Sequence, residues 1–270
     1  MSLTATATTS KAITVSPPMQ SSANGVQTDK PIDIPADAKR VFDVLISGGL
    51  AIVPASIGYG LVAIVPEALE RAFVTKKRMP HKRHAMIGSY SLHKELHVLP
   101  PREAGMVELL CQDFNLPLGV IAPFRADHPL VQKLGAETLA RSSVDGTLAM
   151  LVNGGAFQDE LSRLATEAGL PLMGSSANLT GKGTKSLVED IEPEILRVAD
   201  IVINYGKRTY STPRPSSTMI NFKELELMRF GACYDVIQDV FKRFYGVEFP
   251  NDPGQEVIFS GHLREAAKKL

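Results

Sequence analysis

The run Leu170-Pro171-Leu172-Met173-Gly174-Ser175-Ser176-Ala177-Asn178-Leu179-Thr180-Gly181 decides the fold of this chain. Its first four residues are apolar, which is typical of a short buried strand. The hydroxyl and amide groups that follow should therefore emerge at the end of a strand, where they can face a ligand. A capped turn that serves only the backbone is the alternative interpretation of the same residues.

Two other segments carry side chains that suit a polyphosphate. Lys76-Lys77-Arg78 ends a predicted helix and supplies cations, and Ser216-Ser217-Thr218 precedes an apolar pair and supplies hydroxyl groups. Cations neutralise phosphate oxygens, and short hydroxyl or amide donors fix their position through directed hydrogen bonds. Taken separately, a basic helix end is usually only solvated, and the serines could decorate a strand edge. Together, the segments make a nucleoside triphosphate the suspected ligand.

The rest of the pattern alternates between helices and strands. Short apolar runs predict strands at residues 50–53, 85–87, 119–122, 147–152, 201–203 and 218–220. Periodic apolar positions predict helices at residues 37–47, 66–75, 104–111, 157–168, 193–198 and 234–245. Asp37 is the expected N-cap of the first helix, and Pro66 suits the first turn of the second. Proline-marked turns between the strands favour a twisted α/β sheet of mixed direction over a strictly parallel one.

The length of the chain predicts one main domain. With 270 residues, of which 44% are hydrophobic and 21% charged, the chain can bury one large core. We expect a loose tail over residues 1–30, the main domain over 31–249 and a short C-terminal extension over 250–270. The tail has few large apolar side chains, so it cannot bury enough surface to offset the entropy of ordering. Its lack of acidic residues before Asp29 is shared with mitochondrial transit peptides, but Lys11 is its sole cation before Lys30.

Charge and cysteine content limit the partners and the compartment. The formal net charge is zero, so only a local patch, such as residues 76–84, could attract nucleic acid. No segment reaches the ~20 apolar residues that a membrane span requires. Cys111 and Cys233 have neither metal-ligand spacing nor the number that a disulfide framework needs, so we expect plain buried thiols and a cytoplasmic protein. The sequence carries no signal for an oligomeric state.

Six motifs share the order that they have in a known family: Pro54, Tyr59-Gly60-Leu61, Lys76-x-Arg78, Ser176-Ala177-Asn178-Leu179-Thr180-Gly181, Ser217-Thr218-Met219-Ile220 and Arg229-x-Gly231. In this order they resemble the YrdC-like family of threonylcarbamoyl-AMP synthases. The resemblance spans about Asp37 to Ala232, which is most of the chain expected to be ordered. The Ser-Ala-Asn-Leu-Thr-Gly run and the Lys-x-Arg pair are its most specific parts.

The resemblance implies a YrdC-like α/β fold, a twisted open mixed sheet with flanking helices and a basic concave face. It also implies an enzyme that condenses threonine, bicarbonate and ATP into a carbamoyl-adenylate and releases pyrophosphate, with Mg²⁺ bridging the phosphates. Lys76 and Arg78 would then act in catalysis by neutralising charge as it develops. The implied nucleotide-binding residues are Ser176, Asn178, Ser217 and Arg229. The implied substrate-binding residues are Ser56, Tyr59 and Ser175.

The chain departs from the family's pattern on the amino-acid side of the site. Family members have threonines after the first-strand proline, where this chain has Ala55-Ser56-Ile57. The strand arginine that they place before Ser-Ala-Asn is absent, and Asn153 is closest to its position. Gly58-Tyr59 is closer to the YciO-like branch of the family. Because each lost hydrogen bond to a charged group removes about 1.5–3 kcal/mol, we expect a diverged paralogue whose amino-acid substrate is not fixed as threonine.

Two other functions fit the same residues. The scaffold could transform a small carboxylated metabolite without a nucleotide, or its basic face could bind RNA, which the neutral net charge disfavours. Tyr59 could stack on a base or pack in the core. His81 or His84 could act as a general base if it faces the ligand. His93 and His97 are four residues apart but have no evident third ligand, so we predict no metal site.

Overall fold

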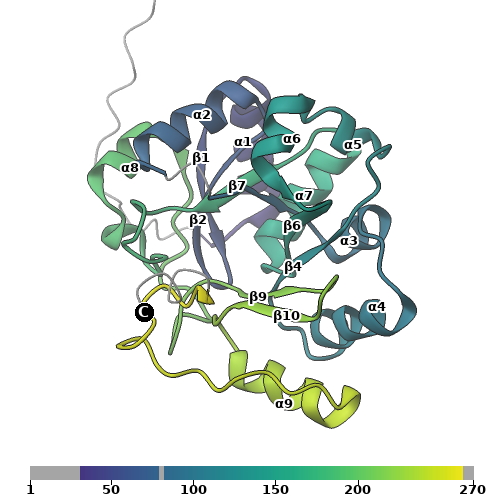
Figure 1. Cartoon of the computed structure of the whole chain (residues 1–270). Helices are drawn as coiled ribbons and strands as arrows, with labels where there is room; N and C mark the ends of the chain where they lie inside the picture. Colours follow the sequence, from purple (N-terminus) through teal and green to yellow (C-terminus); the bar gives the residue numbers. More distant parts are fainter. Residues whose placement is uncertain (1–30, 79–81, 264–270) are drawn as a thin grey trace, which may run out of the picture.

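The computed structural model describes residues 31–78 and 82–263, and within them ten strands form one mixed sheet with helices on both faces (Figure 1). The strand order is β10-β9-β4-β6-β3-β7-β2-β1-β8, and β5 pairs with β6. The bounds are β1 Ala51–Ala55, β2 Gly58–Ala63, β3 Ala85–Ile87, β4 Leu118–Pro123, β5 Ser143–Val144, β6 Thr147–Val152, β7 Met173–Ser176, β8 Ile201–Val202, β9 Thr218–Asn221 and β10 Glu226–Arg229. The pairs β1/β8, β3/β6 and β4/β9 are parallel and the others antiparallel, so the predicted mixed sheet is confirmed.

The helices divide between the two faces of the sheet. Their bounds are α1 Ile34–Ile46, α2 Pro66–Thr75, α3 Tyr90–Leu96, α4 Pro101–Glu108, α5 Pro129–Gln132, α6 Gly135–Ser142, α7 Ala156–Glu167, α8 Pro193–Val198 and α9 Tyr234–Tyr245. A π-helical turn, Leu109–Asp113, extends α4, and a 3₁₀ turn, Val188–Asp190, precedes α8.

The helices α1 and α7 cover one face and lie behind the sheet in Figure 1. Val41 and Leu45 of α1 pack in one cluster with Phe157 and Leu161 of α7. Helical side chains three and four residues apart share a face, so each helix presents a continuous apolar stripe to β1 and β2.

The opposite face of the sheet is covered by the remaining long helices. On this face lies the larger of the two main hydrophobic clusters. Leu69 and Ala72 of α2 and Ile237 and Phe241 of α9 pack in it. α2 and α6 lie in front of the sheet in Figure 1. Because α2 ends beside the carboxyl end of β7, its last residues are placed at the edge of the sheet where the Ser-Ala-Asn run begins.

Most predicted elements lie where they were expected. α2, α8, α9 and β6 have the predicted bounds. The prediction that the first helix begins at Asp37 is wrong, because Asp33 is the N-cap and its carboxylate accepts a 3.1 Å hydrogen bond from the Ala36 amide. Asp37 instead lies in the first turn of α1, where it pairs with Arg40 at 2.6 Å.

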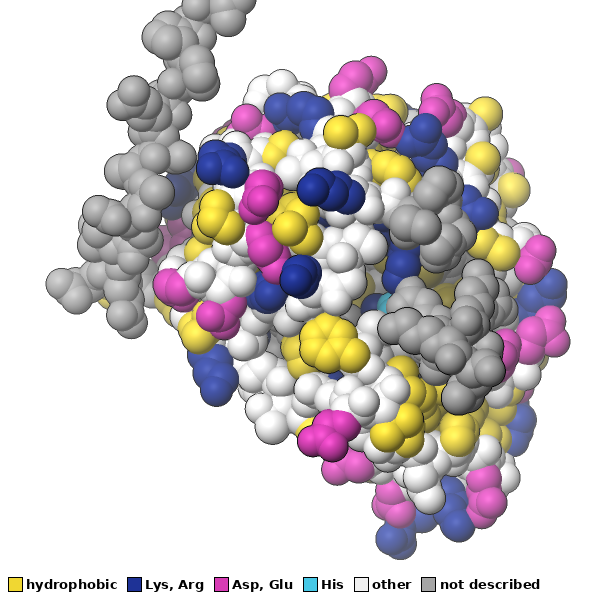
Figure 2. Space-filling view, turned by 60° about the vertical axis from the view of Figure 1, so that its left-hand side comes forward, with side chains coloured by type: hydrophobic (Ala, Val, Ile, Leu, Met, Phe, Trp, Pro, Cys, Tyr) yellow, Lys and Arg dark blue, Asp and Glu magenta, His cyan; other side chains and the backbone are white. Residues whose placement is uncertain are grey.

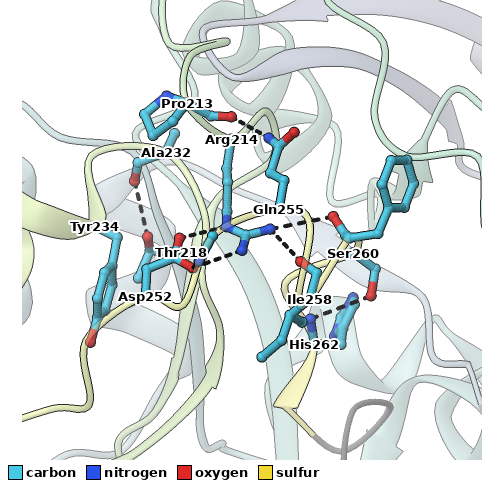
Figure 3. Close-up of polar contacts among 12 residues, drawn as sticks. Pro213, Arg214, Thr218, Ala232, Tyr234, Asp252, Gln255, Ile258, Ser260 and His262 are labelled. Carbon is cyan, nitrogen blue, oxygen red and sulfur yellow. Dashed lines mark hydrogen bonds and ion pairs between the residues drawn. The ribbon is translucent and has the colours of Figure 1, made fainter. Parts of the chain in front are cut away.

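The C-terminal segment, residues 250–263, folds back onto the sheet (Figure 3). The buried guanidinium of Arg214 pairs with both carboxylate oxygens of Asp252, at 2.5 and 2.7 Å. The same guanidinium donates to the Ile258 and Phe259 carbonyls. His262 forms an isolated bridge with Arg229. This part of the predicted extension is therefore joined to the main domain by polar contacts.

Several predictions concern residues outside those described. The loose tail, its reading as a transit peptide, the base role of His81 and the end of the C-terminal extension all fall there. In residues 31–78 and 82–263, no helix combines the length and the apolar composition that crossing a bilayer requires. Cys111 and Cys233 are both free, and burial raises the pKa of the Cys111 thiol to about 12.

Candidate functional site

Lys76 connects the end of α2 to the Ser-Ala-Asn run. It is the C-cap of α2 and is only 2% exposed. Its Nζ donates hydrogen bonds to the backbone carbonyls of Ser176 and Asn178, the second at 2.7 Å. The Thr180 amide donates in return to the Lys76 carbonyl at 3.1 Å. The two most specific motifs of the sequence are thus in direct contact, although 100 residues separate Lys76 from Ser176.

Arg78 and His84 lie beside Lys76. The Arg78 Nη2 donates to the Arg83 carbonyl at 2.6 Å, while its Nε is buried without a partner. His84 is 4% exposed and its Nδ1 also lacks a partner. β3 pairs antiparallel with β7 through Ala85 and Gly174, so His84 lies one position further along, beside Ser175. This group, Lys76, Arg78 and His84, is called the cation cluster below.

The charges of the cation cluster repel one another. Burial, reinforced by Arg78, lowers the pKa of Lys76 to about 7. Burial lowers the pKa of Arg78 to about 10, and burial with the charges of Arg78, Lys76 and Arg141 lowers the pKa of His84 to about 4. Dark-blue cationic side chains and a cyan histidine are visible below the surface in Figure 2, on the face that carries α2 and α8.

No carboxylate forms an ion pair with Lys76 or Arg78 within the described residues. Glu192 is the one acidic group that raises the pKa of Lys76. Its own oxygens are engaged by Lys185 at 3.0 Å and by the Leu179 amide at 3.0 Å. No ion pair joins a carboxylate to Lys76 or Arg78 within residues 31–78 and 82–263. Since buried charges are normally paired, an anionic ligand would complete this arrangement.

The Ser-Ala-Asn run forms the end of β7 and the turn after it. Ser175 and Ser176 pair with Leu61 and Gly60 of β2, and both serines are partly exposed. Asn178 is buried; its Nδ2 donates to the Leu179 carbonyl at 2.6 Å, and its Oδ1 has no partner. The predicted emergence of donors at a strand end is therefore seen in the structure.

Ser217 and Arg229 form a second polar group. The Arg229 Nε and Nη2 donate to the carbonyl and the hydroxyl of Ser217, both at 2.9 Å. The Ser216 amide donates to the Ile57 carbonyl at 3.0 Å, which ties this group to the turn between β1 and β2. Gly231 passes so close that a Cβ there would lie 2.3 Å from the Ser217 carbonyl carbon.

Ser56 and Tyr59 lie on either side of the same turn. The Ser56 amide donates to the Gly154 carbonyl at 2.6 Å, and its hydroxyl is buried without a partner. Tyr59 is 1% exposed, and its hydroxyl donates to the Gly206 carbonyl at 2.7 Å. The structure thus shows Tyr59 packed in the core, while its predicted role in substrate binding stays a prediction.

Two positions near the turn bear on the departures from the family's pattern. Asn153, closest to the place of the missing arginine, has a left-handed backbone and donates to the Asn115 side chain at 3.0 Å. Arg208 donates from Nε to the Ala55 carbonyl at 2.9 Å and stacks over the Tyr59 ring. Sequence reasoning missed Arg208, because it lies in a loop with no periodic pattern.

His93 and His97 form a buried, hydrogen-bonded pair. Their Nδ1 atoms lie 2.8 Å apart, which leaves no room for a cation between them. Burial lowers the pKa of both rings, to about 4 and about 3. Among the described residues, no group of three His, Cys, Asp or Glu side chains could hold a metal ion.

Comparisons with known proteins identify the fold. No family model matches the chain. A curated protein of Methanocaldococcus jannaschii named "Putative threonylcarbamoyl-AMP synthase" is 40% identical over 55 residues, which are 20% of this chain and a quarter (25%) of that protein. A hypothetical protein from Streptococcus mutans superposes with a TM-score of 0.64 at 22% identity, over 78% of this chain and 92% of its own.

Sua5 from P. abyssi, solved as a double variant, superposes with a TM-score of 0.63 at 18% identity, over 85% of this chain and 64% of its own. The chain has the YrdC-like fold. YciO from E. coli shares it at a TM-score of 0.51 and 19% identity, over 72% of this chain and 86% of its own. The fold that the resemblance to the YrdC-like family predicted is therefore confirmed. The chain spans under two thirds of the length of the Sua5 structure.

Proposed function

We propose that this chain binds ATP and forms or processes a carbamoyl-adenylate from an amino acid, bicarbonate and ATP. The observation that carries the proposal is the cation cluster, in which buried Lys76 and half-buried Arg78 have no carboxylate partner among the described residues. A triphosphate supplies the missing negative charge. The partly exposed hydroxyls of Ser175 and Ser176 lie at the same strand end and can donate hydrogen bonds to phosphate oxygens.

The proposed reaction divides the work between the two polar groups. The amine of the amino acid combines with bicarbonate to a carbamate, with loss of water. A carbamate oxygen then attacks the α-phosphorus of ATP, and the bond to pyrophosphate breaks. Lys76 and Arg78 would hold the phosphate oxygens while charge moves onto the leaving pyrophosphate, and Ser217 with Arg229 would fix the nucleotide.

Magnesium fits this site only through the nucleotide. The described residues offer no group of acidic or histidine side chains that could cage a cation. Mg²⁺ commonly keeps its waters and is bound through substrate phosphates in such cases. We therefore propose that Mg²⁺ arrives with ATP and neutralises phosphate oxygens that the cation cluster does not reach.

The amino-acid substrate is proposed to differ from threonine. Sua5 from P. abyssi has been solved in complex with L-threonine, at 20% identity and a TM-score of 0.58 to this chain. Here Ala55 and Ile57 stand at the threonine positions of the family's pattern, so the two hydroxyls of that pattern are missing. A site without these hydroxyls offers fewer hydrogen bonds to the side chain of threonine.

Calorimetry followed by a turnover assay tests the proposal. Mg-ATP is titrated into the protein, and pyrophosphate release is then measured with bicarbonate and each of the common amino acids. Arg78→Met removes a charge whose hydrogen bond to phosphate stabilises binding by about 1.5–3 kcal/mol, so ATP affinity should fall at least about tenfold. Lys77→Met is the matched control, because Lys77 is adjacent to Arg78 in the sequence, carries the same positive charge and is exposed.

The outcomes separate the alternatives. ATP binding that depends on Arg78 but not on Lys77, with pyrophosphate release for at least one amino acid, supports the proposal. Absence of binding heat for ATP together with absence of pyrophosphate release would falsify it. Turnover of a small carboxylated compound without nucleotide would replace it by the nucleotide-independent alternative.

A further inference from the structure

We infer that His84 is a third anion-binding residue of the cation cluster, and that it takes up a proton when the phosphate groups of ATP arrive. The inference rests on the proposed function, since it concerns the same ligand. The family resemblance assigns no role to His84. What points to it is its place in the structure, beside the Ser-Ala-Asn run and within the field of Lys76 and Arg78.

The geometry places His84 where a ligand held by Lys76 and Arg78 would lie. The antiparallel register of β3 and β7 sets it beside Ser175, at the strand end where Ser176 and Asn178 are held by Lys76. The ring is 4% exposed and packs on Phe73 of α2, with ring centroids 5.9 Å apart. Its Nδ1 is buried and has no hydrogen-bond partner.

A structural role would normally give this imidazole a partner. Buried polar atoms in native proteins are nearly always hydrogen-bonded, so a group without a partner calls for a ligand or a function. The Nε of Arg78, whose charge acts on His84, is also buried without a partner. A phosphate has several acceptor oxygens and could accept hydrogen bonds from both nitrogens.

The charges that act on His84 come from two elements, α2 with the residues after it and α6. Lys76 and Arg78 follow α2 and act on it directly, and Arg141 reaches it from α6. Arg141 is itself paired with Glu70 of α2 and with Glu137 of α6. Burial is the main reason that the pKa of His84 lies near 4 in the free protein, and the charges of Arg78, Lys76 and Arg141 lower it further.

A bound polyphosphate reverses this balance. Negative charge beside the ring favours the imidazolium, so the pKa of His84 rises on binding. The free protein holds His84 neutral at pH 6, and the complex holds it protonated, so binding takes up a proton. By linkage, ATP affinity then rises as the pH falls, by at most about tenfold per pH unit for one proton.

Lys76 adds a second proton in a different pH range. Its pKa near 7 means that it is already charged at pH 6 and mostly neutral at pH 8. Arg78, Lys82 and Glu192 are the groups that act on it. Proton uptake at pH 6 therefore reports on His84, and additional uptake at pH 8 reports on Lys76.

Calorimetry in two buffers measures the uptake. Mg-ATP is titrated at pH 6.0 in MES and in Bis-Tris, whose ionisation enthalpies differ, and the difference in binding heat gives the protons exchanged. Comparing the wild type with His84→Gln cancels the protonation of ATP itself. His128→Gln is the control for loss of a histidine elsewhere, since His128 lies at the N-terminus of α5.

We expect the wild type and His128→Gln to take up about half to one proton more per ATP than His84→Gln does, at pH 6. Equal uptake by wild type and His84→Gln overturns the inference and leaves ATP binding intact. Absence of ATP binding by the wild type overturns both the inference and the proposed function.

A second measurement covers the case in which His84→Gln does not fold. The His84 ring of the wild-type protein is followed by NMR between pH 4 and 8, with and without Mg-ATP, after backbone-based assignment. A midpoint that moves upward by a pH unit or more with ATP supports the inference. A midpoint that ATP leaves unchanged overturns it.

Discussion

The buried ammonium of Lys76 predicts that this protein becomes more stable as the pH rises above 7. Burial and Arg78 lower its pKa from 10.5 to about 7 in the folded state, while the unfolded chain keeps the ordinary value. Between these two values the unfolded chain binds more protons than the native protein does. The free energy of unfolding therefore increases with pH in this range, because protonation of Lys76 favours the unfolded chain.

The size of the effect follows from the pKa of the folded state. One proton contributes at most about 1.4 kcal/mol per pH unit. Lys76 is half protonated in the native protein at pH 7 and nearly neutral at pH 8.5, so its contribution between these values is about 1.6 kcal/mol. Cys111 and Cys233 oppose it, because burial raises the pKa of both thiols and the unfolded chain loses those protons first. Between pH 7 and 8.5 the two thiols together lower the free energy of unfolding by about 0.3 kcal/mol.

Chemical unfolding of the wild type and of Lys76→Met isolates the contribution. Guanidinium titrations at pH 7.0, 7.75 and 8.5, with reducing agent and without nucleotide, give the free energy of unfolding at each pH. The wild type should gain more than 1 kcal/mol over this range relative to Lys76→Met, since the thiol contribution is common to both. Lys77→Met should follow the wild type, because the Lys77 side chain is exposed.

The absolute stability of Lys76→Met is not the diagnostic quantity. The substitution removes a desolvated charge but leaves the Ser176 and Asn178 carbonyls without their donor, and these two effects oppose each other. The slope with pH is free of this ambiguity, since methionine does not titrate. If the slope of the wild type equals that of Lys76→Met, Lys76 is charged and solvated in the native protein and the reasoning is wrong.

Three further predictions concern the contacts around the site. Asp252→Asn should destabilise the protein by about 3 kcal/mol in denaturant unfolding, because it leaves the buried Arg214 guanidinium without its charge partner. Since Arg214 lowers the pKa of Asp252, the wild type should lose this contribution as the pH falls below about 4, and an acid unfolding curve checks it. Gly231→Ala should weaken ATP binding in calorimetry by displacing the Ser217 backbone, whereas Gly60→Ala, whose Cβ would meet nothing closer than 3.7 Å, should bind as the wild type does.

The elements that local chemistry determines could be predicted from the sequence. Pro66 and the apolar stripe of α2 predicted both ends of that helix correctly. The end of α9 at Tyr245 is followed by Gly246, whose left-handed backbone caps the helix. The strand β2 was missed, because Gly58 and Gly60 dilute its apolar pattern. It forms because the turn at residues 56–57 folds it back against β1, and β7 then pairs with its other edge.

In the candidate site, too, local features could be predicted from the sequence, while contacts between distant residues could not. The cations at the end of α2 and the donors after β7 were predictable, since each belongs to a local pattern. The inward turn of the Lys76 ammonium was not, because it depends on carbonyls that lie a hundred residues away in the chain. The packing of Tyr59 was also undecided by sequence, since its hydroxyl partner comes from the loop at Gly206.

The arrangement of the site explains how the chain can depart from the YrdC-like sequence pattern on one side only. The cation cluster is carried by the end of α2, the start of β3 and the end of β7, which contact one another directly. The changed positions, Ser56 and Asn153, belong to the turn after β1 and the end of β6, which meet through the Ser56 amide and the Gly154 carbonyl. Substitutions in the second group leave every contact of Lys76 in place. Under the proposed function, specificity for the amino acid could therefore change while the phosphate-binding residues stay in place.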